Sequence, residues 1–161
     1  MRHAKAEQYA ETDHERALEP KGRRDAEAAG SWLARQEIEP DYALVSSATR
    51  AVETWVAVAD SADWELEPDV DSALYDAGPE SALDVIRAVP EDTRTLLFIG
   101  HNPTAAYLAQ LLDGGDGDAE AADAMAKGFP AAALAVLEFE GPWDDLELGS
   151  ARLTALHVPR G

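Results

Sequence analysis

The sequence predicts an α/β fold in which a mostly parallel sheet is covered by helices. Three observations support this: short runs of β-forming residues recur along the chain, amphipathic helical patterns lie between them, and proline stands at plausible starts of three helices. Alternating strands and helices are typical of α/β proteins with a sheet buried on both faces. With no repeat or evident linker in its 161 residues, the chain is expected to form one domain over residues 1–161.

The expected strands are short apolar runs bounded by polar or turn-forming residues. They span residues 43–46, 96–100, 133–139 and 153–158, with a weaker candidate at 64–66. The expected helices carry apolar residues at spacings of three and four, so that each can bury one face. They span residues 21–36, 49–59, 80–88 and 104–112, and a Gly- and Asp-rich loop at 114–123 leads into a short Ala-rich helix.

The chain is strongly acidic, with 32 Asp and Glu against 13 Lys and Arg and a formal charge of −19. This field repels nucleic acid and anionic lipid, so neither is an expected partner. No apolar run is long enough to cross a bilayer, and the absence of Cys excludes disulfides and thiolate nucleophiles. A cytoplasmic location is the default expectation. An anionic substrate would have to be held by a few inward-facing Arg side chains, because the overall charge repels it.

Two polar segments directly follow predicted strands, where ligands collect in α/β sheets. One is Ser46-Ser47-Ala48-Thr49-Arg50, and the other is Gly100-His101-Asn102-Pro103. Each places a side chain that can bind phosphate at the end of a strand. These two segments are therefore the first candidates for a binding site.

Four motif elements occur in the order seen in the histidine phosphatase superfamily. They are Arg2-His3-Ala4; Arg16-Ala17-Leu18 with Gly22; Ser46-Ser47 with Arg50-Ala51 and Glu53-Thr54; and Gly100-His101-Asn102-Pro103. In detail the chain resembles the small SixA-type phosphohistidine phosphatases, and the resemblance extends to Lys127-Gly128-Phe129-Pro130. It implies a three-layer α/β/α sandwich of the phosphoglycerate mutase type.

The resemblance also implies a metal-independent phosphatase that uses His3 as the nucleophile and needs no cofactor. A neutral imidazole is a competent nucleophile near pH 7, and a phosphohistidine intermediate divides one hydrolysis into two easier displacements. Arg2, Arg50 and Arg16 would hold the phosphoryl oxygens with permanently charged, forked donors, and His101 would add a further donor. We expect these five side chains to converge on one pocket. No two His residues have the spacing of a helical metal site.

The motif contains no clear general acid. Larger members of the superfamily place a Glu or Asp after a middle strand, whereas the corresponding region here reads Ala73-Leu74-Tyr75-Asp76-Ala77-Gly78. An imidazole leaving a protonated phosphohistidine has a conjugate-acid pKa of about 6.5, against well above 12 for an alkoxide, so it needs much less acid assistance. Asp76 and Asp13 are the two candidate proton donors.

Members of the superfamily have a short apolar strand immediately before the Arg-His pair, but only Met1 precedes Arg2 here. We therefore expect this N-terminal strand to be missing, with a gap in the core and a mobile terminus beneath His3.

Three functions remain open from the sequence. A phosphorylated protein carrying phosphohistidine suits the compact chain and the absent acid. The same site could instead hydrolyse a small phosphate ester. If the missing strand left the pocket unformed, the chain would be a catalytically silent module that binds phosphate or a phosphoprotein.

Overall fold

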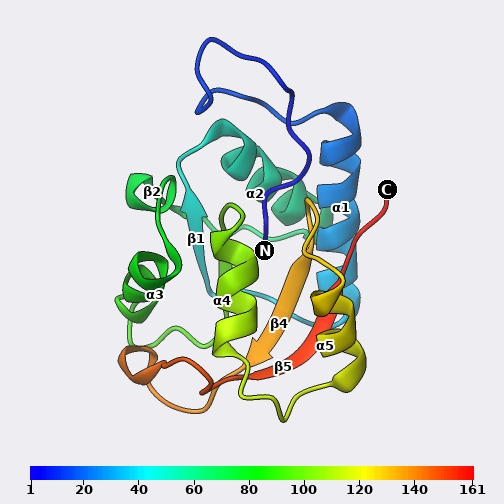
Figure 1. The fold of residues 1–161 in the computed structure, drawn as a ribbon. Helices are drawn as coiled ribbons and strands as arrows, with labels where there is room; N and C mark the ends of the chain where they lie inside the picture. The colour runs from blue at the N-terminus through cyan, green and yellow to red at the C-terminus, as the bar shows by residue number, and fades with distance from the viewer.

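A computed structural model describes all residues, 1–161, and places helices on both faces of the strands (Figure 1). The helices are α1 (Pro20–Arg35), α2 (Thr49–Ala62), α3 (Pro79–Arg87), α4 (Thr104–Leu112) and α5 (Ala119–Ala126), with 3-10 turns η1 (Ser72–Leu74) and η2 (Trp143–Asp145). The strands are β1 (Tyr42–Ser46), β2 (Asp69–Asp71), β3 (Leu96–Ile99), β4 (Leu134–Glu138) and β5 (Arg152–His157). The predicted α/β class is confirmed.

The strands form two separate parts. β1 pairs in parallel with β2 on one side and with β3 on the other, whereas β4 and β5 form an antiparallel pair. Successive residues of β1 face opposite layers, as expected for a strand buried on both sides. Ala43 and Val45 belong to the core that contains α1 and α2, and Leu44 belongs to the core that contains α3 and α4. This alternation gives the three predicted layers.

The prediction of a strand at residues 64–66 is wrong, because the structure has no strand there. Trp64 and Leu66 pack against the core, and the Trp64 ring stacks near that of Trp55 with 6.2 Å between centroids. The edge strand of the sheet beside β1 is β2 instead. Its backbone pairs with β1, while its side chains are largely exposed. An apolar pattern cannot identify such a strand, because backbone pairing and not side-chain burial defines it.

The N-terminus is held between the two parts of the sheet. No strand is assigned before Arg2. However, Met1 is buried and its amine donates to the Phe98 carbonyl at 2.8 Å. The Arg2 N–H donates to the Ala133 carbonyl at 3.0 Å. The expectation of a mobile terminus is therefore wrong, because His3 follows residues that are bonded to both β3 and the start of β4.

The expected gap in the core is present as a largely apolar slot of about 830 Å³ between β3 and β4. No other strand pairs with β3 or β4 on the side that faces the slot, where Met1 bonds to Phe98 of β3. Met1 lies at one end, and side chains that include Leu33 of α1 and Leu108 of α4 line it from the two helical layers. The gap thus lies within the sheet, beside the residues that hold His3.

Gly22, near the start of α1, allows the segment after His3 to pack closely. A Cβ at Gly22 would lie 2.0 Å from the Lys5 carbonyl oxygen, which also accepts a hydrogen bond from the Glu19 N–H at 2.9 Å. We expect Gly22→Ala to displace this segment, to lower the free energy of unfolding by about 1–3 kcal/mol, and to reduce any activity of the site. Urea denaturation and steady-state kinetics measure both effects.

Gly78→Ala is the matched control for this substitution. No atom lies within 4 Å of a Cβ placed at Gly78, and its backbone φ of −74° suits any residue. An equal loss of stability in the two variants would show that the close approach at Gly22 has no special importance.

Candidate active site

His3 and His101 lie together at the carboxyl end of β3. Their ring centroids are 5.1 Å apart and their planes are tilted by 56°. Arg2 forms a parallel bridge with Gly100, and the His3 N–H donates to the Gly100 carbonyl at 2.9 Å. The N-terminal and C-terminal motif elements therefore meet through backbone pairing.

One ring nitrogen of His3 is bonded to the backbone and the other is not. Nδ1 lies 2.7 Å from the Ala4 carbonyl oxygen. A carbonyl can only accept, so Nδ1 carries the hydrogen and Nε2 keeps its lone pair. Burial lowers the pKa of His3 to about 3, which makes the ring neutral at pH 7. This tautomer has the lone pair that a nucleophile requires.

Side chains of α2 hold the segments around His3. Thr54 Oγ1 accepts from the Ala4 N–H at 3.0 Å and donates to the Arg50 carbonyl at 2.6 Å. The Glu53 carboxylate accepts from the Leu18 N–H at 2.6 Å. Sequence reasoning placed Glu53 and Thr54 in a motif but assigned them no role. Their contacts make them positioning residues, because they bind backbone and leave the pocket to other groups.

Ser46 orients His101. The Ser46 hydroxyl lies 2.7 Å from Nε2 of His101, and Ser46 is completely buried at the end of β1. Nδ1 of His101 is buried without a partner in the protein. Burial also lowers the pKa of His101 to about 4, so this ring too is neutral at pH 7. Ser46 is a third positioning residue, after Glu53 and Thr54, whose role the motif did not reveal.

Arg2 and Arg50 bring two guanidinium groups close enough to His3 for their charges to lower the pKa of its ring. Arg50 is buried, and it donates through Nη1 to the Asp13 carbonyl at 2.7 Å and through Nη2 to the Asp13 carboxylate at 3.0 Å. Nε of Arg2 and Nε of Arg50 are both buried without a partner. Buried donors are usually paired, and an oxyanion is a ligand that would pair them.

The carbonyl of Phe129 connects two parts of the site. It accepts from Arg2 Nη1 at 3.1 Å and from Asn102 Nδ2 at 2.9 Å. Gly128 immediately before it has a φ of +134°, a conformation that favours glycine. These contacts give a structural reason for the motif before β4, which sequence reasoning noted without explaining.

Asp13 gathers three donors at the rim of the site. Its carboxylate accepts from Tyr75 at 2.5 Å, from Arg16 Nε at 2.8 Å and from Arg50 Nη2 at 3.0 Å. The hydrogen bond from Tyr75, aided by the two arginines, lowers the pKa of Asp13 to about 2. Asp13 is therefore ionised at neutral pH and poorly suited to donate a proton. Arg16 is paired with Asp13 at the rim, close enough for its charge to lower the pKa of His101.

Tyr75 is a site residue that sequence reasoning missed. Its ring stands edge-on to His101 with 5.7 Å between centroids, and the Arg50 guanidinium carbon lies 5.8 Å from the ring centre. Its neighbour Asp76 is exposed, and the Asp76 charge raises the pKa of His101. Asp76 therefore remains a candidate proton donor. The sequence pointed to this part of the site only through Asp76, because this candidate proton donor directly follows Tyr75.

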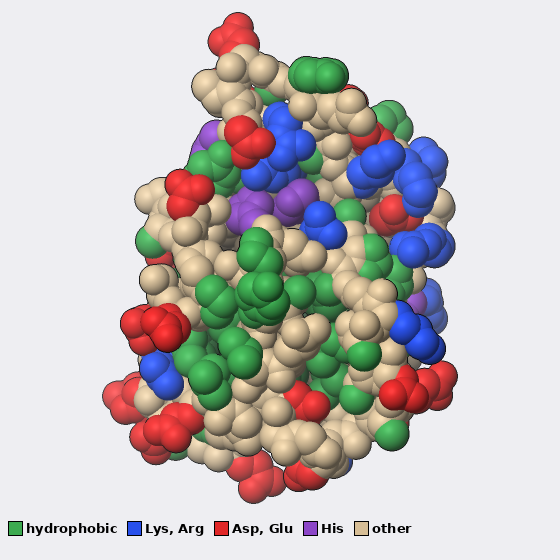
Figure 2. Space-filling model, in the orientation of Figure 1, with side chains coloured by type: hydrophobic (Ala, Val, Ile, Leu, Met, Phe, Trp, Pro, Cys, Tyr) green, Lys and Arg blue, Asp and Glu red, His purple; other side chains and the backbone are tan.

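The site differs in charge from the rest of the surface. Figure 2 shows the purple imidazoles in the upper part of the visible face with blue Lys and Arg side chains beside them, while most red acidic side chains lie around the edge of the view. No group of three or more His, Cys, Asp or Glu side chains could hold a metal ion. None of the helices is both long enough and apolar enough to cross a membrane.

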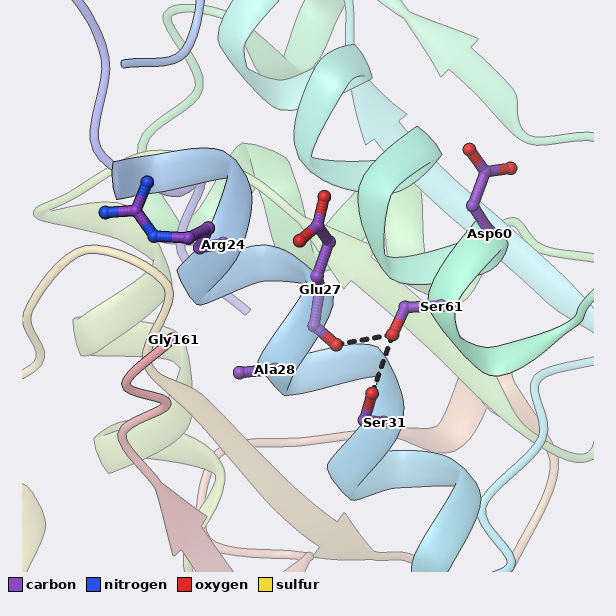
Figure 3. A pocket seen from close by; sticks show the side chains of 7 residues that line it. All are labelled: Arg24, Glu27, Ala28, Ser31, Asp60, Ser61 and Gly161. Atoms are coloured by element: carbon purple, nitrogen blue, oxygen red, sulfur yellow. Dashed lines mark hydrogen bonds between the residues drawn. The ribbon is translucent and has the colours of Figure 1, made fainter. Parts of the chain in front are cut away.

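A second cavity of about 520 Å³ lies between α1, α2 and the C-terminal Gly161 (Figure 3). It contains neither histidine of the site. The Ser61 hydroxyl donates to the Glu27 carbonyl at 2.6 Å and lies 2.7 Å from the Ser31 hydroxyl. These hydroxyl groups are thus paired within the protein, and the cavity is separate from the candidate active site.

Known proteins are similar to this chain in sequence and in fold. The family description "Histidine phosphatase superfamily (branch 1)" matches residues 1–78. An uncharacterised protein of Mycobacterium tuberculosis is 39% identical over 163 residues, covering 99% of this chain and 100% of the relative. A solved structure from Nakamurella multipartitia, provisionally named the phosphohistidine phosphatase SixA, is 34% identical with a TM-score of 0.85, covering 99% of this chain and 93% of that chain. A similarly named structure from Agrobacterium tumefaciens is 28% identical with a TM-score of 0.82, covering 99% and 95%.

The chain therefore belongs to the histidine phosphatase superfamily. Within this superfamily its fold and sequence are of the SixA type. These relationships support a phosphatase that acts on phosphorylated substrates.

The neutral state of both site histidines can be tested by titration. Because burial lowers the pKa values of His3 and His101 to about 3 and 4, their imidazole NMR signals are expected to stay those of neutral rings from pH 8 down to pH 5. The signals are assigned with His3→Ala and His101→Ala. A ring that titrates near the ordinary value of about 6.5 would contradict the buried geometry.

The lowered pKa values of His3 and His101 also predict that the folded state becomes less stable in acid. Below pH 6.5 the unfolded chain binds protons on these rings, whereas the folded chain does so only near pH 4 and pH 3. Stability is therefore expected to fall as the pH drops from 6.5 toward this range. The melting temperatures of the wild type and of His3→Ala, compared at pH 7.5 and pH 5.5, measure the contribution of His3.

Proposed function

We propose that the protein hydrolyses phosphohistidine in another protein through a second phosphohistidine formed on its own His3. The observation that carries the proposal is Nε2 of His3, a free lone pair on a neutral ring beside His101, Arg2 and Arg50. A nucleophile next to unpaired cationic donors is the arrangement that phosphoryl transfer requires.

The proposed reaction has two displacements. Nε2 of His3 attacks phosphorus while the bond from phosphorus to the leaving nitrogen breaks, and the substrate ring, which is protonated on its other nitrogen, departs as neutral imidazole. Arg2 and Arg50 bind the nonbridging oxygens, and His101 donates to one of them. Water then attacks the phosphoryl group on His3, which releases inorganic phosphate and restores the free ring. No metal ion takes part in this proposed sequence.

Phosphohistidine is favoured as the substrate because neither candidate proton donor, Asp13 or Asp76, is a well-placed acid. Asp13 is held ionised, and Asp76 is exposed. A neutral imidazole needs little acid assistance, whereas an alkoxide needs a well-placed acid. The alternative substrate, a small phosphate ester, depends on Asp76 acting as that acid. The silent-module alternative depends on an unformed pocket, and the backbone bonds that hold Met1 and His3 argue against it.

The test compares two substrates with the same protein preparation. One is a histidine-phosphotransfer domain phosphorylated on its histidine, and the other is p-nitrophenyl phosphate, each assayed with and without EDTA. We expect kcat/KM to be higher on the phosphohistidine domain by about tenfold or more, because imidazole and p-nitrophenolate both leave without strong acid assistance but only the domain can contact the protein outside the pocket. EDTA should change neither rate. A preference for the ester would favour the alternative substrate, and no turnover of either would overturn the proposal.

A further inference from the structure

An exposed apolar strip runs along α4 away from the catalytic pocket. α4 contains no charged residue, although 28% of the chain is charged. Its outer side exposes half of Tyr107 and 44% of Leu111, and the neighbouring Leu148 is 57% exposed. These are three of the six large hydrophobic side chains that the molecule exposes, so they form a concentration and not a random scatter. Figure 2 shows green side chains gathered below the purple imidazoles, over the position of α4 in Figure 1.

The strip is continuous with the active site. Pro103, which is exposed, precedes α4 and lies two residues after His101. Pro103, Tyr107 and Leu111 are spaced by four residues and so follow one side of the helix. The Gly149 N–H donates to the Leu111 carbonyl at 2.7 Å, which brings Leu148 to the far end of the strip. We call Pro103, Tyr107, Leu111 and Leu148 the α4 strip.

The length of the α4 strip excludes a small substrate as its ligand. At a rise of about 1.5 Å per residue, the eight positions from Pro103 to Leu111 extend about 12 Å from the edge of the pocket. A phosphate ester bound between His3 and His101 would not reach Leu111. A macromolecule that presents its phosphoryl group to this pocket would cover the strip.

We propose that the α4 strip is the docking surface for the phosphoprotein substrate, which contacts it through an apolar helix face next to the phosphorylated residue. This inference rests on the proposed function. A helix is the occupant that fits, because side chains at four-residue spacing form a ridge that packs into the groove of another helix. Glu147, the exposed residue that precedes Leu148, places a negative charge at the far end of the strip, so a basic residue flanking the partner's apolar face would complement it.

The test separates docking from chemistry. We expect Tyr107→Ala and Leu111→Asp to lower kcat/KM on the phosphorylated histidine-phosphotransfer domain by about 10-fold to 100-fold, mainly through KM, as for central interface residues. Turnover of p-nitrophenyl phosphate should stay within about twofold, because the strip lies outside the reach of that substrate. Val56→Asp is the matched control, since Val56 is 43% exposed on α2 and lies outside the strip. It should leave both rates unchanged.

Two outcomes would overturn the docking surface: normal kinetics of both strip variants on the phosphorylated domain, or an equal loss on both substrates, which would indicate damage to the fold. Calorimetric binding of the same phosphorylated domain to His3→Ala provides a readout that does not need turnover. Adding Leu111→Asp to that variant should weaken binding at least about tenfold, and unchanged binding would also overturn the inference. Failure of the proposed function is recognised differently, by a wild type that hydrolyses neither substrate.

Discussion

His3→Ala is expected to form no phosphoenzyme, because it removes the Nε2 lone pair that the proposed first displacement uses. Brief reaction with a ³²P-labelled substrate, followed by denaturation and measurement of acid-labile label on the protein, tests this directly. The wild type should retain label and the variant should retain none. Acid-labile phosphate on His3→Ala would show that another residue is the nucleophile.

His101→Ala is the informative comparison for this experiment. His101 is the other neutral imidazole of the pair, but Ser46 engages its Nε2 and its proposed role is only to donate a hydrogen bond. We expect a slow residual reaction, reduced by roughly 10² to 10³, which is typical for the loss of one stabilising donor. A complete loss of labelling in both variants would mean that the two rings cannot be given separate roles.

Arg50→Lys is expected to lower kcat by about 10² or more although it keeps the positive charge. The Arg50 guanidinium donates to both the carbonyl and the carboxylate of Asp13, and its buried Nε has no partner in the protein and can bind a phosphoryl oxygen. A lysine ammonium is a single point of charge and cannot reproduce three donors in one plane. Steady-state kinetics on both phosphate substrates measure the effect.

Arg152→Lys is the control for this substitution. Arg152 pairs with Glu138 on the exposed side of β5, and exposed ion pairs contribute about 0 to 1 kcal/mol. Its kinetics should be those of the wild type. If Arg50→Lys were equally normal, Arg50 would be an ordinary helix residue and the proposed phosphate-binding role would be withdrawn.

The elements that the sequence predicted are those that contribute at least one buried side chain to a core. β1 was found because Ala43, Leu44 and Val45 alternate between two apolar layers. β2 was missed because its pairing uses backbone atoms and its side chains remain largely exposed. The periodicity of apolar residues therefore predicted the layers of the fold but not the full width of the sheet.

The site shows a similar division between side chains and backbone. Motifs pointed to His3, His101, Arg2 and Arg50, and the fold brings all four together. The groups that fix their positions were not predictable in the same way. The carbonyl of Phe129 has no side-chain signature, and the contact between Tyr75 and Asp13 joins loops whose approach depends on the whole fold.

Because of the slot between β3 and β4, the active site lies at the boundary between two structural units, the sheet of β1, β2 and β3 and the β4–β5 pair. His101 follows β3, whereas Arg2 is held by Ala133 and Phe129 just before β4. Detachment of the β4–β5 hairpin would remove this support from Arg2 while leaving β1, β2 and β3 paired. The free energy of that partial opening, which is never larger than that of global unfolding, therefore sets the range of temperature and denaturant over which the protein can act.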